Sequence, residues 1–231
     1  MMISIINWLV FFSIQSGLVV VDSHKTQIAE PSDICLGRSQ GEYMVAGSKY
    51  KIAAIDEKGT LIGEFDTPCA DLEAICTDGN FYYGSEESFQ MIYVFNKSDF
   101  SVVKTVPLNH HGGRNEGVEA FTWFAAANCF VAITEENPCK FMLLNKDFSA
   151  KEEFTVPGIS EASSVTVKNS NLYVLSEKNH AIYHLDMAKK SIQEEWDLPV
   201  LGAEGLVFKD NGNVLVVSDA MARIYELELK K

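Results

Sequence analysis

The sequence has no amphipathic helical stripe of useful length after residue 25. Gly, Pro, Asn and Asp interrupt every window before three helical turns are complete. In their place stand short runs rich in β-branched and aromatic residues, separated by Asp-Gly, Asn-Gly and Lys-Gly turns. We therefore expect an all-β chain.

Positive charge is also scarce. The 231 residues include 19 Lys and Arg against 32 Asp and Glu, which gives a formal net charge of −13. A chain of this charge is repelled by phosphate backbones and by anionic lipid surfaces. We expect no nucleic-acid partner.

Cysteine is sparse and unpatterned. The five cysteines are an odd number and contain no Cys-x-x-Cys pair, so a structural zinc site is not expected. In an exported chain, Cys69 would join Cys76 or Cys129 would join Cys139. Buried free thiols are the alternative, and spacing alone does not decide between them.

Familiar catalytic motifs are missing as well. There is no phosphate-binding loop, no dinucleotide fingerprint and no Gly-x-Ser-x-Gly elbow. Ser85, Ser176 and Ser218 each precede an acidic residue, but an internal repeat accounts for all three at once. A serine hydrolase is therefore disfavoured.

What the chain does contain is a fivefold repeat with a period of about 43 residues. Each repeat opens on a short acidic or small-residue string whose central residue is Glu or Ser. These central residues, the first register, are Ser32, Glu73, Glu119, Ser163 and Glu204, with spacings of 41, 46, 44 and 41. Such a spacing is near the length of one four-stranded propeller blade.

Each repeat has room for four short strands, which predicts a five-bladed β-propeller of four-stranded antiparallel blades. Five units of this size leave no room for a second domain, so residues 18–231 are expected to form a single propeller domain. We also expect the protein to be a monomer. The last repeat ends at Leu229 without a fourth strand. Because propellers close their rings, a strand from roughly Leu18 to Ile28 is expected to complete that blade.

Residues 1–17 form an apolar N-terminal segment. Its length suits a secretory signal peptide or a membrane anchor, but no Lys or Arg precedes it and no small-x-small cleavage site stands out. An ordinary structural segment is the alternative. The first reading predicts a periplasmic or membrane-attached protein, and the second leaves a cytoplasmic location open.

A second register follows 13 to 16 residues after the first, where an apolar run ends in a hydroxyl residue and an acid. Its acids are Glu86, Glu135, Glu177 and Asp219. Because consecutive strands run in opposite directions, both registers are expected at one mouth of the central channel. Glu73, Glu119 and Glu204 would lie near the axis, with the second-register acids as a surrounding shell.

Such a concentration of carboxylates needs compensation. Three carboxylates about 6 Å apart at an effective dielectric near 20 would repel by roughly 3 kcal/mol per pair. A cation, protonation or solvent screening would relieve this repulsion. Hard oxygen ligands without a thiol or imidazole set favour Ca²⁺, with Mg²⁺ second, and Ser32 and Ser163 offer neutral oxygens. The alternative is that the carboxylates only cap strand ends at a wet channel mouth.

The repeat openings resemble the SdiA-regulated (YjiK-like) family of bacterial β-propeller proteins. The strings that carry the resemblance are Asp71-Leu72-Glu73-Ala74-Ile75, Asn115-Glu116-Gly117-Val118-Glu119-Ala120-Phe121, Ala203-Glu204-Gly205-Leu206 with Val216-Val217-Ser218-Asp219, Glu30-x-Ser32 and Glu161-x-Ser163. Asp33 and Ser164 replace the glycine usual in the last two. The resemblance covers about residues 28–229 and implies an envelope propeller, linked in some members to calcium and stress signalling, without settled catalysis.

Two functions follow from this sequence. The first is a non-catalytic, calcium-binding propeller whose mouth binds a small ligand or an envelope protein. The alternative is a metal-dependent hydrolase (esterase, lactonase or phosphoesterase), in which the cation polarises the substrate and His110 or His111 activates water. A flexible Gly-rich loop is the simpler reading of those two histidines.

Overall fold

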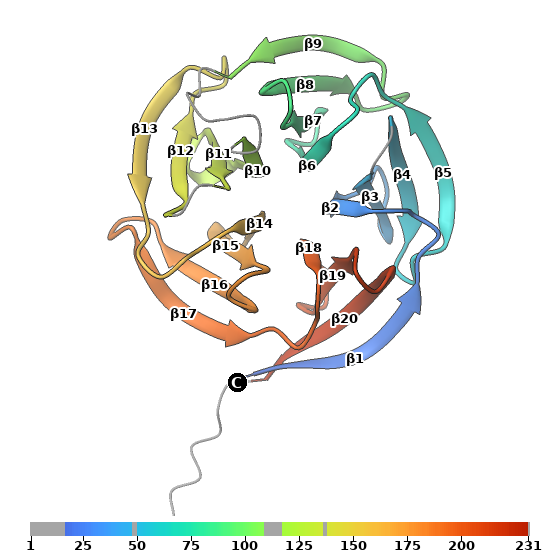
Figure 1. The fold of residues 1–231 in the computed structure, drawn as a ribbon. Helices are drawn as coiled ribbons and strands as arrows, with labels where there is room; N and C mark the ends of the chain where they lie inside the picture. The colour runs from blue at the N-terminus through green and yellow to red at the C-terminus, as the bar shows by residue number, and fades with distance from the viewer. Residues whose placement is uncertain (1–16, 48–49, 109–116, 136–137, 231) are drawn as a thin grey trace, which may run out of the picture.

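The protein is a five-bladed β-propeller, as the repeat predicts (Figure 1). The computed structural model describes residues 17–47, 50–108, 117–135 and 138–230. Four blades contain four consecutive strands each. They are β2 (Pro31–Leu36), β3 (Glu42–Gly47), β4 (Lys51–Asp56) and β5 (Leu61–Asp66); β6 (Leu72–Thr77), β7 (Phe81–Glu86), β8 (Met91–Asn96) and β9 (Val102–Pro107); β10 (Val118–Phe124), β11 (Cys129–Thr134), β12 (Lys140–Leu144) and β13 (Ala150–Thr155); and β14 (Ala162–Lys168), β15 (Asn171–Ser176), β16 (Ala181–Asp186) and β17 (Ser191–Asp197).

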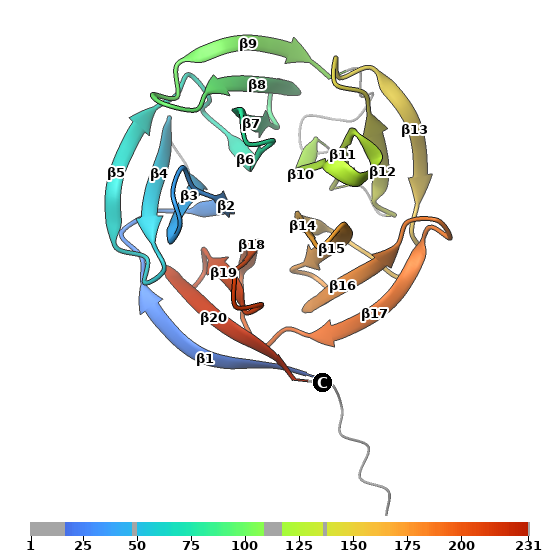
Figure 2. The same ribbon diagram turned by 180° about the vertical axis from the view of Figure 1, so that it is seen from behind.

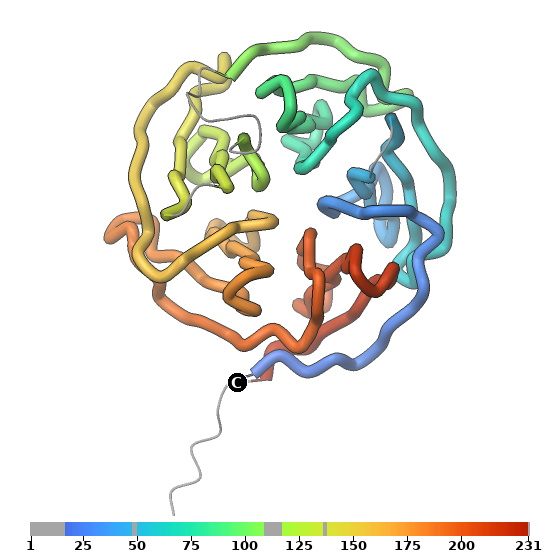
Figure 3. Tube along the Cα trace, in the orientation of Figure 1, coloured from blue at the N-terminus to red at the C-terminus, as the bar shows by residue number. Residues whose placement is uncertain are grey.

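The fifth blade joins the two ends of the described chain. Its strands β18 (Ala203–Phe208), β19 (Val214–Ser218) and β20 (Arg223–Lys230) are completed on the outside by β1 (Gly17–Lys25). Figure 3 shows the N-terminal trace running beside the C-terminal trace at the rim of the ring. The expected closure is confirmed, although the strand spans Gly17–Lys25 and ends before Ile28.

The innermost strands β2, β6, β10, β14 and β18 surround the central axis, and the outermost strands form the rim (Figures 1 and 2). Because every blade is antiparallel, the start of each innermost strand and the end of the second strand lie at the same end of the ring. We call this end the mouth. The first and second registers of the sequence both fall there.

The hydrophobic core fills the spaces between neighbouring blades. Phe130 of β11 in the third blade, for example, packs edge-on against Tyr83 of β7 in the second blade, with 4.7 Å between ring centroids. Large aromatic and branched side chains suit these interfaces because each of them contacts two neighbouring sheets and buries apolar surface on both. All five cysteines are free and buried in this core, so the alternative of buried thiols is confirmed and neither expected disulfide is present.

Two ion pairs of the buried Lys209 tie the fifth blade to the first. Lys209, which follows β18, places its Nζ 2.7 Å from a carboxylate oxygen of Glu226 in β20 and 2.7 Å from one of Glu57 in the first blade.

In the described ranges, helical structure is limited to the short turn η1 (Ala125–Ala127), and no helix there is long and apolar enough to cross a bilayer.

Candidate functional site

A β-bulge occurs at the start of every innermost strand. In each blade the pairing with the second strand shifts across one residue, for example between Leu72 and Ala74. The residues skipped by the five shifts are those of the first register, Ser32, Glu73, Glu119, Ser163 and Glu204. A bulge removes a residue from the ladder and redirects its side chain, and bulges are common beside functional sites. The sequence repeat is thus the repeat of a bulge at the mouth.

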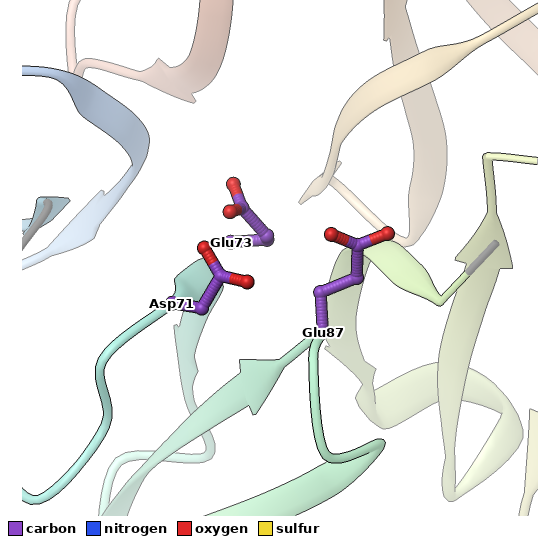
Figure 4. Close-up of side chains that lie close together, drawn as sticks. All are labelled: Asp71, Glu73 and Glu87. Carbon is purple, nitrogen blue, oxygen red and sulfur yellow. The ribbon is translucent and has the colours of Figure 1, made fainter. Parts of the chain in front are cut away.

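Five carboxyl groups gather on one side of the mouth, over the second and third blades. Asp71, Glu73 and Glu87 form one group and Glu87, Glu119 and Glu135 form another, and within each group one oxygen per residue lies within 4.8 Å of the others. Figure 4 shows the first group, with Asp71 and Glu73 at the start of β6 and Glu87 just past the end of β7. Glu87 belongs to both groups. We call these five residues the carboxylate cluster.

Crowding and burial disfavour the charged forms of Glu73 and Glu119. Burial, the Asp71 charge and a hydrogen bond to Asp71 raise the pKa of Glu73 to about 8. Burial and the charges of Glu73, Glu87 and Glu135 raise the pKa of Glu119 to about 10. Among the described residues, no Lys, Arg or His forms an ion pair with Asp71, Glu73, Glu87 or Glu119. The site therefore favours either bound protons or a bound cation.

Glu204 lies on the other side of the mouth. It lines one cavity of about 180 Å³ together with Glu119 and Glu177, and another of about 220 Å³ together with Glu73 and Asp219. Burial, followed by the Glu177 and Asp219 charges, raises the pKa of Glu204 to about 7. Glu204 thus shares one cavity with Glu119 and the other with Glu73, although it is not a member of the carboxylate cluster.

The placement of Glu86 was wrong by one residue. Glu86 pairs with Leu72, the position that Thr134, Ser176 and Ser218 occupy in later blades, and it is only 1% exposed. Because side chains alternate along a strand, a slip of one residue reverses the direction of the side chain. Glu87 instead occupies the position that Glu135 and Asp219 have in their blades. The backbone hydrogen bonds show the equivalence: the amide of Glu87 donates to Asp71 O, that of Glu135 to Gly117 O, and that of Asp219 to Gly202 O.

The hydroxyl groups of the second register have structural roles. Ser218 Oγ donates to Leu201 O at 2.7 Å, and Ser85 Oγ donates to Val118 O of the next blade at 3.0 Å. Ser176 Oγ donates to Ser160 O and accepts from the amide of Asn179. These hydroxyls tie strand ends to the loops between blades.

A buried polar bridge closes the centre of the ring next to the mouth. Asp33, 1% exposed, accepts from the hydroxyl of Ser164 at 2.7 Å and from the amide of Ile75 at 2.9 Å. Ser164 also accepts from the amide of Leu206 at 3.2 Å. The bridge links the first, second, fourth and fifth blades. Asp33 and Ser164 each follow a bulged residue, where the sequence departs from the usual glycine.

Sequence reasoning missed Asp71 and Glu87 as members of the site. A second acid two residues before Glu73 and a doubled Glu at the end of β7 are their signals in the sequence. His110 and His111 lie outside the described residues. The described residues that line the two mouth cavities include no histidine.

The fold and the site together define a five-bladed propeller with a carboxylate-lined mouth. The chain belongs to the SdiA-regulated family, whose model matches residues 29–228, and this confirms the resemblance seen in the repeat openings. No curated protein sequence matches the chain.

Solved structures share the architecture at low identity. Glutaminyl cyclase of Myxococcus xanthus superposes with a TM-score of 0.77 at 11% identity, over 93% of this chain and 97% of that chain. Virginiamycin B lyase from Staphylococcus aureus gives 0.54 at 15% identity, over 87% and 66%. The WD40 propeller domain of Doa1 gives 0.54 at 13% identity, over 84% and 62%. At these identities the likeness establishes the fold alone.

Proposed function

We propose that this protein is a non-catalytic β-propeller that binds a divalent cation at its mouth. The observation that carries the proposal is the carboxylate cluster, in which two groups of three carboxyl side chains share Glu87. A cation placed among these oxygens would offset the mutual repulsion that raises the pKa values of Glu73 and Glu119.

The donor set favours Ca²⁺ over Mg²⁺. Ca²⁺ takes six to eight oxygen ligands in flexible geometry, whereas Mg²⁺ requires a near-ideal octahedron. The cluster offers carboxylate oxygens from five side chains, and Ser32 adds a hydroxyl that hydrogen-bonds to Glu73. No thiol or imidazole belongs to either group, so metals that prefer sulfur or nitrogen are disfavoured.

The proposed setting is the bacterial cell envelope, where the mouth binds a small ligand or a partner protein in calcium or stress signalling. Support for this setting comes from the family resemblance and from the apolar segment at residues 1–17. The alternative, a metal-dependent hydrolase at the same mouth, requires a general base beside the cation. The described residues that line the mouth cavities supply carboxylates, which suit a bound cation, and His110 and His111 of the alternative lie outside the described residues.

Thermal unfolding tests the proposal. A cation that binds only the folded ring raises the melting temperature by mass action. We expect CaCl₂ to raise the Tm relative to EDTA in the wild-type chain and in Glu64→Gln, an exposed acid on the outer strand β5. Glu87→Gln removes the residue shared by both groups and should abolish the shift. An equal shift in Glu87→Gln would place the cation elsewhere, and no shift in the wild-type chain would reject the proposal.

A further inference from the structure

Exposed apolar side chains stand around part of the mouth. Phe89 in the β7–β8 turn is 72% exposed, Met221 in the β19–β20 turn 48%, Leu201 in the β17–β18 loop 63% and Tyr50 in the β3–β4 turn 53%. These connections all lie at the mouth end of the ring because strands alternate in direction. We call the four residues the apolar rim. They belong to the fifth, first and second blades, which are consecutive around the ring.

The turns do not require apolar side chains at these positions. Phe89 and Met221 are both the third residue after the buried residue that ends the second strand of their blade. The fourth blade has the polar Asn179 at this place. The turn is held through the backbone amide of this residue and not through its side chain: the amide of Met221 donates to the hydroxyl oxygen Ser218 Oγ at 3.1 Å, as the amide of Asn179 donates to Ser176 Oγ. The side chains of Phe89 and Met221 are therefore free to serve a contact outside the chain.

Tyr50 adds an exposed aromatic ring to the rim. Its φ is +68°, in the left-handed region that is unfavourable for a bulky side chain. The turn needs this conformation because Tyr50 O accepts from the amide of Thr67 at 2.9 Å. Glycine would adopt it without strain, and a ring that is 53% exposed adds little to the core. The same backbone conformation recurs at Gln90, His180 and Ala222, so it belongs to the turn, and the exposed ring of Tyr50 is what adds apolar surface to the rim.

Acidic groups lie directly beside the rim. The fifth blade supplies Leu201 and Met221 to the rim and Glu204 and Asp219 to the mouth cavities. The amide of Asp219 donates to Gly202 O at 3.0 Å, which holds the turn of Met221 against the loop of Leu201. The described residues lining both cavities include several acids and no Lys or Arg. The rim is thus complementary to an apolar surface that carries positive charge.

We propose that the mouth docks a polypeptide segment of a partner protein in which a Lys or Arg is flanked by apolar side chains. The basic side chain would lie against Glu204 and the acids beside it, and the flanking side chains would pack on the apolar rim. An anionic membrane surface fits less well because the chain carries a net charge of −13 and an acidic mouth. This inference names the partner class for the proposed binding mouth, and it does not require the cation.

The probe is a fluorescein-labelled, amidated peptide, Leu-Phe-Lys-Leu-Phe, titrated with the full chain and followed by fluorescence anisotropy. We expect saturable binding, and at least about tenfold weaker binding when Glu replaces the Lys of the peptide. The double variant Phe89→Ser with Met221→Ser should also bind about tenfold more weakly or worse, because two apolar contacts are lost. The matched control is Ile62→Ser with Val103→Ser, two exposed apolar residues on outer strands, which should bind as the wild type does.

The two proposals fail in different ways. Glu87→Gln should lose the Ca²⁺ melting shift and keep peptide binding, whereas the rim double variant should lose peptide binding and keep the shift. No saturable binding, or binding that the rim variant leaves unchanged, would overturn the inference. Preferential binding to vesicles of phosphatidylcholine and phosphatidylglycerol would overturn it in favour of a lipid surface.

Discussion

Asp33 reaches across the centre of the ring. Its carboxyl group accepts from a hydroxyl of the fourth blade and from an amide of the second. Burial raises the pKa of Asp33 to about 8 against the opposing effect of these hydrogen bonds. A buried carboxyl group with hydrogen bonds to two other blades holds non-adjacent blades at a fixed separation, so the mouth above it keeps one geometry.

Replacing this side chain should weaken the whole ring. Asp33→Ala removes two buried hydrogen bonds and leaves the amide of Ile75 without its acceptor, so we expect a loss of about 2–3 kcal/mol in unfolding free energy by urea denaturation. Asp33→Asn keeps the shape and one acceptor and should lose less. An Asp33→Ala variant as stable as the wild type would contradict a bridging role.

The raised pKa values of the mouth predict how stability depends on pH in EDTA. The ordinary Glu value is 4.5, against about 7 for Glu204 and about 8 for Glu73 in the folded protein. The folded state therefore holds these protons more tightly than the unfolded state. Their stabilising contribution is complete below about pH 4.5 and is lost as the pH rises through about 7 to 8.

We expect the Tm in EDTA to fall by on the order of 5 °C between pH 5.5 and pH 8.5, followed by circular dichroism. The double variant Glu73→Gln with Glu204→Gln should show a flatter profile because amides do not titrate. A Tm that rises over this interval, or a slope that the double variant leaves unchanged, would show that the mouth does not control the pH dependence.

Glu86 and Glu87 show where sequence reasoning reaches its limit at a single position. Aligning the blades on the hydroxyl residue put Ser85 level with Thr134 and so placed Glu86 at the mouth. Strand pairing puts Glu86 level with Thr134, which buries Glu86 and brings Glu87 to the mouth. Register is fixed by backbone pairing across the blade, and two adjacent acids in a sequence do not reveal which one faces the channel.

β1 is the strand on which ring closure depends. It covers the free edge of β20, and Leu18 packs into the core between the fourth and fifth blades, where Leu227 and Trp196 are also buried. The sequence alone predicted this pairing because the last repeat lacks a fourth strand and an uncovered edge is unfavourable. The exact end of the strand depends on the bulge between Val20 and Asp22, which composition does not reveal.

Substitution in β1 measures how much this closure contributes. Leu18→Ala opens a cavity in a buried contact, so we expect a loss of about 2–4 kcal/mol in unfolding free energy. Val21→Ala, at an exposed position of the same strand, should change it by less than about 0.5 kcal/mol. Both are read from urea denaturation. Equal effects of the two substitutions would mean that β1 does not pack as a fourth strand.

The ring as a whole explains why the fold was easier to predict than the site. Five repeats of similar length fix the number of blades, and the alternation of strand direction fixes which residues share an end. The side chains at the mouth do not follow this fivefold repeat. The carboxylate cluster lies over the second and third blades, whereas the apolar rim lies over the fifth, first and second blades. Such differences between blades come from single positions within a common framework.

Direct titration of the EDTA-treated, dialysed chain with CaCl₂ by isothermal calorimetry, at about pH 8, tests the central claim. The account predicts saturable binding of Ca²⁺ to the wild-type chain, uptake by Glu64→Gln to the same extent, and loss of binding in Glu87→Gln. A wild-type chain that takes up no Ca²⁺, or a Glu87→Gln variant that binds it with unchanged affinity, would contradict a cation site in the carboxylate cluster.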